Sequence, residues 1–68
     1  MNYRREHAHS GDLHLEVWVV NDRAFWRVEN LRTHEQLKID ESKDIETAKD
    51  QARAAAKASD QIEWKTIG

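Results

Sequence analysis

Apolar and polar residues alternate most clearly over residues 13–20, and this pattern predicts a strand with one buried face. The residues expected to face inward are Leu13, Leu15, Val17 and Val19, and those expected to face outward are His14, Glu16 and Trp18. Asn21 and Asp22 both tolerate positive φ. They therefore predict a two-residue hairpin turn that leads into a second strand over about residues 24–29.

The register of this hairpin can be argued from its cross-strand pairs. With Asn21 and Asp22 as the whole turn, the pairs are Glu16 with Arg27, Trp18 with Phe25, and Val17 with Trp26. A shift by two residues would instead set Glu16 against Glu29, and two facing carboxylates repel. Either register puts Trp26 and Val28 on the inward face.

Residues 30–34 form the next predicted reversal. His34 stands where a glycine would normally relieve the backbone, so we expect a positive φ there. A third strand is predicted over residues 35–40, with Leu37 and Ile39 inward and Gln36 and Lys38 outward.

Residues 40–59 carry the start signal, stop signal and apolar stripe of one helix. Ser42 or Asp44 can cap its first turn, because a short side-chain oxygen there accepts a hydrogen bond from a free backbone N–H. The apolar stripe is Ile45, Ala48, Ala52 and Ala55. Because this stripe is almost all alanine, the bulk of the core must come from the sheet, chiefly from Trp26 and Trp64.

The residues after the helix, 61–67, alternate at Ile62, Trp64 and Thr66. They predict either a short fourth edge strand or a tail over the open end of the core. The fold class is therefore α+β, a three-stranded antiparallel β-meander with one C-terminal helix packed across one face. We expect residues 1–12 to be a flexible polar leader and residues 13–68 to form a single small domain.

Composition narrows the class of protein. The chain has 68 residues and no cysteine, which excludes disulfides and thiolate metal sites. Its 11 basic and 13 acidic residues leave a net charge of −2, which does not indicate nucleic acid. No apolar run approaches the length of a membrane span, so we expect no membrane partner and a cytoplasmic location.

One cluster has the spacing of metal ligands. His7, His9, Asp12 and His14 could form a set for zinc or nickel, because histidines two apart on an extended segment point the same way. The preferred interpretation is a solvated, histidine-rich leader, and we expect no metal site and no cofactor. No nucleophile and base are placed together by the sequence, so we expect no enzymatic activity.

The outward face of the predicted sheet carries the strongest functional signal. Trp18 and Phe25 lie side by side there, among Glu16, Arg27 and Lys38. An aromatic pair ringed by charge is typical of protein interfaces, so these five residues are the predicted protein-binding site. Two other readings stay open: the pair only stiffens an exposed hairpin, or the C-terminal tail covers it and brings Trp64 to that face.

The order of elements over residues 13–59 resembles the DNA-binding domains of plant ethylene-response factors and the amino-terminal domain of tyrosine integrases. That resemblance implies a sheet inserted into the major groove, with basic side chains on phosphates. The residues that would do this here are Arg23, Arg27, Arg32 and Lys38, supported by Arg4 and Arg5. On the sheet face itself Glu16 and Glu29 offset Arg27 and Lys38.

Three functions follow from the sequence. The favoured one is a small, non-enzymatic regulatory or adaptor protein that binds another protein through the exposed sheet face, of the kind encoded by bacteria or their phages. The alternatives are a nucleic-acid-binding module that uses the three-stranded sheet, and a homodimer formed through the sheet face or an edge strand.

Overall fold

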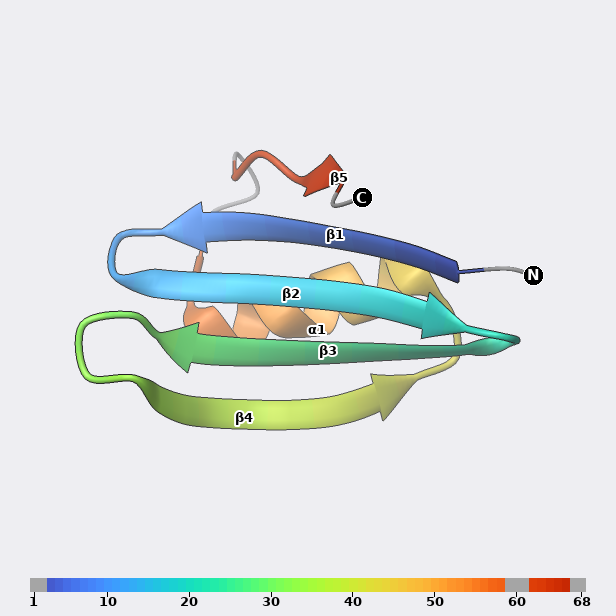
Figure 1. Cartoon of the computed structure of the whole chain (residues 1–68), viewed down its shortest axis with the longest axis horizontal. Coiled ribbons are helices and arrows are strands. Elements are labelled where there is room, and N and C mark those ends of the chain that lie inside the picture. Colours follow the sequence, from blue (N-terminus) through green and yellow to red (C-terminus); the bar gives the residue numbers. More distant parts are fainter. Residues whose placement is uncertain (1–2, 59–61, 67–68) are drawn as a thin grey trace.

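The computed structural model describes residues 3–58 and 62–66, and it shows one sheet with a helix against one of its faces (Figure 1). Its elements are β1 Tyr3–Ser10, β2 Leu13–Val20, β3 Arg23–Asn30, β4 Glu35–Ser42, α1 Ile45–Ala56 and β5 Lys65–Thr66. The strands pair antiparallel in the order β4-β3-β2-β1-β5. The predicted α+β class, an antiparallel sheet followed by one helix, is confirmed.

β1 occupies the segment for which the sequence predicted a flexible leader. Its residues pair one to one with β2, from Tyr3 opposite Val20 to Ser10 opposite Leu13. The inward positions of β1 include Glu6 and Ala8, which are 5% and 2% exposed. Neither is a large apolar residue, so the apolar alternation that marks a strand is absent from this segment. The prediction of a leader is therefore wrong for residues 3–12.

The central hairpin of β2 and β3 has the predicted turn and register. Of the two turn residues, Asn21 adopts a positive φ of 57° and Asp22 does not. The pairs Glu16 with Arg27, Val17 with Trp26, and Trp18 with Phe25 are all present. In the next turn His34 has a φ of 61°, as expected.

β4 differs from the prediction in which face its residues occupy. An irregularity in the pairing between Val28 and Glu29 shifts the register, so that Lys38 lies opposite Val28 and Ile39 opposite Arg27. Lys38 is thus on the helix side of the sheet, with its Nζ 5.8 Å from the centre of the Trp26 ring. The prediction of Leu37 and Ile39 inward and Lys38 outward is wrong, and both apolar residues are about half exposed.

The helix begins and ends at residues that complete its backbone hydrogen bonding. The Asp44 side chain caps the first turn by accepting from the Thr47 N–H at 2.8 Å. Lys57 adopts a left-handed φ of 55° at the other end. The buried alanines are Ala48, Ala52 and Ala56. Ala55, which the sequence placed in the stripe, is exposed. The buried alanines follow one another at a spacing of four residues, whereas the predicted stripe had spacings of three and four residues.

The core lies between α1 and the central strands. Its buried sheet residues are Leu15, Val17, Ala24, Trp26 and Val28. The small helix residues let the helix approach the sheet closely, and Trp26 supplies the bulk, as the sequence predicted. Ile62 and Trp64 pack against the margin of the core on the helix side.

β5 is a two-residue strand that pairs with β1 through Glu6 with Thr66 and His7 with Lys65. From the sequence, this segment was expected to be either a short edge strand or a tail over the open end of the core, and the described residues show a short edge strand. α1 lies behind the central strands β2 and β3 and runs roughly along them, so the chain passes behind the sheet between β4 at one edge and β5 at the other (Figure 1). Within the described residues, no helix is both long enough and apolar enough to cross a membrane.

Candidate binding surface on the open sheet face

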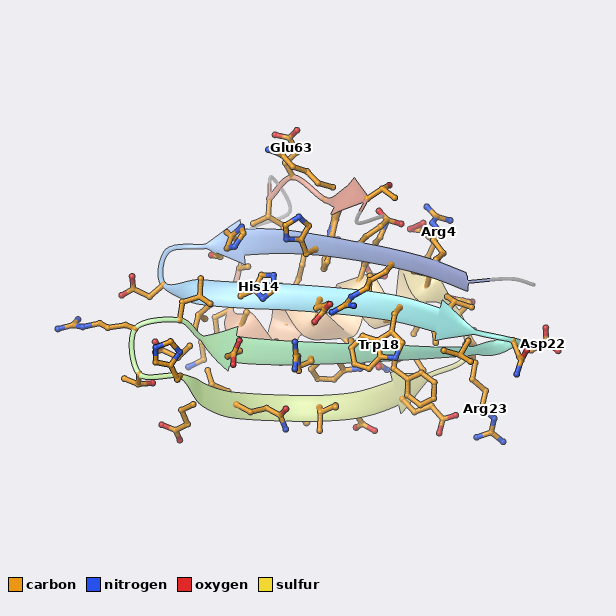
Figure 2. The ribbon with its side chains drawn as sticks, in the orientation of Figure 1. Arg4, His14, Trp18, Asp22, Arg23 and Glu63 are labelled. Atoms are coloured by element: carbon orange, nitrogen blue, oxygen red, sulfur yellow. The ribbon has the colours of Figure 1, made fainter. Side chains whose placement is uncertain are left out.

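The sheet face that α1 does not cover is called here the open face. The paired registers place on it the side chains of Arg5, His7, His9, His14, Glu16, Trp18, Phe25, Arg27, Glu29 and Ile39. Figure 2 shows His14 and Trp18 in front of the sheet, on the side away from α1. Three groups follow one another along this face: a histidine cluster, a charged cluster and an aromatic pair.

The charged cluster is built around Glu16, which is only 2% exposed although it lies on the face away from α1. Arg27 on β3 donates from Nη2 to Glu16 Oε1 at 2.5 Å. Arg5 on β1 holds the other carboxylate oxygen through Nε and Nη2. The carboxylate is thus screened from water by two guanidinium groups.

The aromatic pair lies next to this cluster, toward the β2–β3 turn. The Trp18 and Phe25 rings stack with their centres 5.8 Å apart and their planes 18° apart. Both side chains are half-buried. Arg5, Glu16, Trp18 and Arg27 line a shallow hollow of about 180 Å³. The open face therefore joins an apolar surface directly to a charged site that contains two guanidinium groups.

The C-terminal segment does not cover this pair within the described residues. β5 pairs with β1 at the far edge of the sheet, whereas Trp18 and Phe25 lie on β2 and β3. Trp64 lies on the helix side, where the Lys49 Nζ is 5.6 Å from its ring centre. The reading in which the tail covers the pair and brings Trp64 to the open face is wrong.

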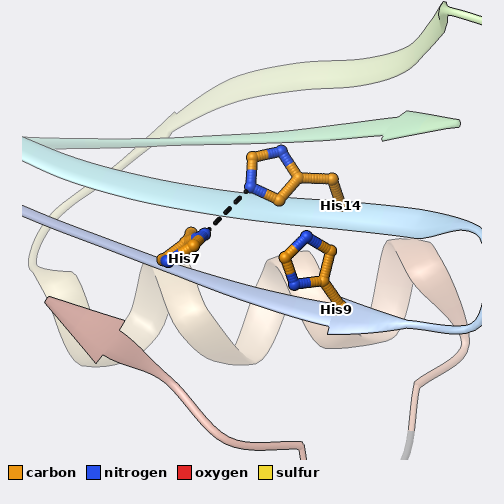
Figure 3. A group of neighbouring side chains, drawn as sticks. All are labelled: His7, His9 and His14. Atoms are coloured by element: carbon orange, nitrogen blue, oxygen red, sulfur yellow. Dashed lines mark hydrogen bonds between the residues drawn. The ribbon is translucent and has the colours of Figure 1, made fainter. Parts of the chain in front are cut away.

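The histidine cluster lies toward the β1–β2 turn (Figure 3). His7 Nδ1 and His14 Nε2 are 3.3 Å apart, and the His9 and His14 rings stack at 4.8 Å. Burial, followed by the nearby His9, lowers the pKa of His14. The structure brings together three of the four residues that the sequence considered as ligands, and leaves the fourth, Asp12, exposed in the turn.

The basic residues proposed for nucleic acid do not form one surface. Arg23 pairs with Glu41 at 2.6 Å, and Arg27 is held by Glu16. Lys38 faces the helix side, where it lines a hollow with Trp26 and the exposed alanines of α1. Arg32 lies in the turn between β3 and β4. The phosphate-binding stripe that a groove reader needs is therefore not assembled by the described residues.

Four of the five predicted protein-binding residues share the open face: Glu16, Trp18, Phe25 and Arg27. Lys38 does not, because of the shifted register of β4. The residue that the sequence missed is Arg5, which completes the charged cluster. The signal for it was the spacing of Arg5, His7 and His9, which alternates with period two in step with a strand.

Comparison of the chain with protein-family models, with curated proteins and with solved structures gave no match. The function has to be argued from this surface itself.

Proposed function

We propose that this chain is a non-enzymatic regulatory or adaptor protein that binds another protein through its open face. The observation that carries the proposal is the stacked Trp18–Phe25 pair, left uncovered beside the Arg5–Glu16–Arg27 cluster. Buried tryptophan and arginine side chains dominate the binding energy of protein interfaces. The hollow here, about 180 Å³, is smaller than the 300–1,000 Å³ typical of small-molecule sites.

The charges of the open face indicate the chemistry of the partner. Arg27 lines the hollow with its side chain 33% exposed, and among the described residues Glu16 engages its guanidinium only at Nη2, so the hollow suits an acidic side chain of the partner. The adjoining aromatic pair suits an apolar side chain next to it. The partner is therefore a protein surface that presents a carboxylate beside an apolar or aromatic residue.

The test uses the immobilised chain to capture a partner from an extract of the source cells, followed by calorimetry on the purified pair. Trp18→Ala should weaken binding at least about tenfold, and more if the ring is a full hot spot worth about 2 kcal/mol or more. Leu31→Ala is the matched control, because Leu31 is an exposed apolar residue in the β3–β4 turn, at the other end of the sheet. An unchanged dissociation constant for a folded Trp18→Ala variant would contradict the proposal.

The nucleic-acid alternative predicts a different pattern of effects on binding. Binding would then fall steeply with added salt and depend on Arg23→Ala and Arg32→Ala more than on Trp18→Ala. Retention of duplex DNA that survives Trp18→Ala but not these arginine variants would favour it.

A second candidate, a homodimer, is favoured by one observation on β4. This strand has a described neighbour on one side only, and its residues 35–41 are all exposed. Antiparallel pairing of two copies about Ile39 would set Lys38 opposite Asp40 of the partner subunit, and the reverse. Sedimentation tests this: Asp40→Lys should weaken a dimer, and the double swap with Lys38→Asp should restore it.

A further inference from the structure

The β1–β2 hairpin gathers three imidazoles at one point of the open face. His9 lies directly opposite His14 in the register, and His7 is two residues before His9 on the same face. Figure 3 shows the rings of His7 and His9 rising from β1 toward that of His14 on β2. The arrangement is fixed by backbone pairing on both strands, so the three side chains stay neighbours without any ligand.

The distances within this cluster suit a single ion. Ligand nitrogens about 2.0–2.1 Å from a tetrahedral zinc lie about 3.3–3.4 Å from one another. The separation of His7 Nδ1 and His14 Nε2 is 3.3 Å, and ligand atoms of all three residues lie within 4.8 Å of one another. Binding an ion requires the hydrogen bond between His7 and His14 to give way and the imidazoles to turn toward a common point by rotation about their side-chain bonds.

The donor set defines the class of metal. Three neutral imidazole nitrogens suit zinc, nickel and copper, whereas calcium and magnesium prefer oxygen ligands. Three protein ligands also leave a position of a four-coordinate ion open. A hollow of about 240 Å³, lined by His7, Ala8, His9, Glu63 and Lys65, adjoins the cluster, so water can reach that position.

We propose that His7, His9 and His14 bind one divalent late transition-metal ion, with zinc as the reference, and that water completes its coordination. The site is independent of the proposed protein partner, since the three ligands come from one hairpin of this chain. The charges around the cluster are mixed: Glu16, Glu29 and Arg27 on one side, and Glu63 and Lys65 on the other. A bound dication therefore meets no one-sided repulsion.

Calorimetric titration of the full, tag-free chain with zinc chloride at neutral pH is the first test. We expect one ion per chain with a dissociation constant in the micromolar range or tighter, and a raised melting temperature. His9→Gln and His14→Gln should each weaken binding at least about tenfold. His34→Asn is the matched control, because His34 lies in the β3–β4 turn outside the cluster, and asparagine tolerates its φ of 61°. Magnesium should produce no binding.

A second measurement keeps the test valid if a variant unfolds. In the imidazole nitrogen spectrum of the wild-type chain, zinc should shift the signals of His7, His9 and His14 and leave His34 unchanged. Absence of binding at 100-fold excess zinc would overturn the proposal. So would binding that survives loss of all three histidines, or shifts that appear equally at His34.

Discussion

Replacement of Trp26 tests the arrangement of the core on which the open face depends. Its side chain is 3% exposed, between the sheet and the buried alanines of α1. Its indole Nε1 donates to Gln51 Oε1 at 2.9 Å, which ties the ring to the helix. Trp26→Ala therefore removes both the largest apolar group of the core and a hydrogen bond between its two layers.

The expected loss can be set against the whole stability of the chain. Burial of a tryptophan removes about 150–250 Å² from water, worth about 4–6 kcal/mol at about 25 cal/mol per Å². The hydrogen bond adds about 1 kcal/mol. A chain of 68 residues is stable by about 3–10 kcal/mol in total. Trp26→Ala should thus be largely unfolded at 25 °C, whereas Trp26→Phe should lose about 1–2 kcal/mol.

Urea denaturation followed by far-UV circular dichroism measures both losses, with the wild-type chain as reference. The Phe variant shows whether the cooperative transition is retained when only the hydrogen bond and part of the ring are lost. If Trp26→Ala unfolded cooperatively at nearly the wild-type urea concentration, the ring would not be buried under α1. The assignment of the open face would then fail as well, because the two faces of β3 are fixed together.

Three further predictions concern the helix and are checked by urea or thermal unfolding. Ala52→Leu should lose about 1–3 kcal/mol by overpacking, while Ala54→Leu on the exposed side is nearly neutral; equal stability would place the buried line elsewhere. Lys49→Met should destabilise the fold by up to about 3–5 kcal/mol, because it removes the ammonium group that lies 2.9 Å from the buried Glu6 carboxylate. An unchanged free energy of unfolding would mean that Arg4 alone neutralises that carboxylate. The hydrogen bond from the Thr47 backbone N–H lowers the pKa of Asp44 in the folded state. The stability that the Asp44 carboxylate contributes is therefore present above its unfolded-state pKa and is lost as pH falls through the lower folded-state pKa. Asp44→Asn should make the loss of stability toward acid pH less steep, and an unchanged slope would contradict this prediction.

The central hairpin was predictable because apolar and polar residues alternate along both of its strands and so identify the buried and the outward face. Leu15, Val17, Trp26 and Val28 are large, apolar and in step with a period of two, so face and register followed together. The charge of Glu16 against Arg27 then selected between the two registers. The aromatic pair and two of the three members of the charged cluster, Glu16 and Arg27, were predicted for the same reason.

β1 was not predictable from its own residues. Its inward positions hold Glu6 and Ala8, and Glu6 is compensated by Lys49, which lies 2.9 Å away on α1, far along the chain. The pattern of apolar and polar residues within β1 cannot show that a charged side chain is buried there, because the residue that neutralises it is distant in the sequence. Because β1 was not predicted, Arg5 was not placed in the charged cluster from the sequence, and His7 and His9 were not predicted to lie beside His14.

β4 failed for a different physical reason. Leu37 and Ile39 alternate with polar residues as an inward face would, but one irregularity in pairing turns every following side chain to the other face. Lys38 is thereby removed from the candidate site and Ile39 is added to the open face. A strand at an edge, exposed along residues 35–41, does not need its apolar residues to point into the core.

The three tryptophans of the chain provide the most direct test of the open face as the binding surface. Each lies in a different place: Trp18 on the open face, Trp26 in the core, and Trp64 at the helix side of the β1 edge. Their indole N–H signals are recorded in a ¹⁵N-labelled chain during titration with the purified protein partner. The proposal predicts a saturable shift of the Trp18 signal, with Trp26 and Trp64 nearly unchanged. A Trp18 signal that stays fixed while the partner binds, with shifts at Trp64 instead, would contradict it.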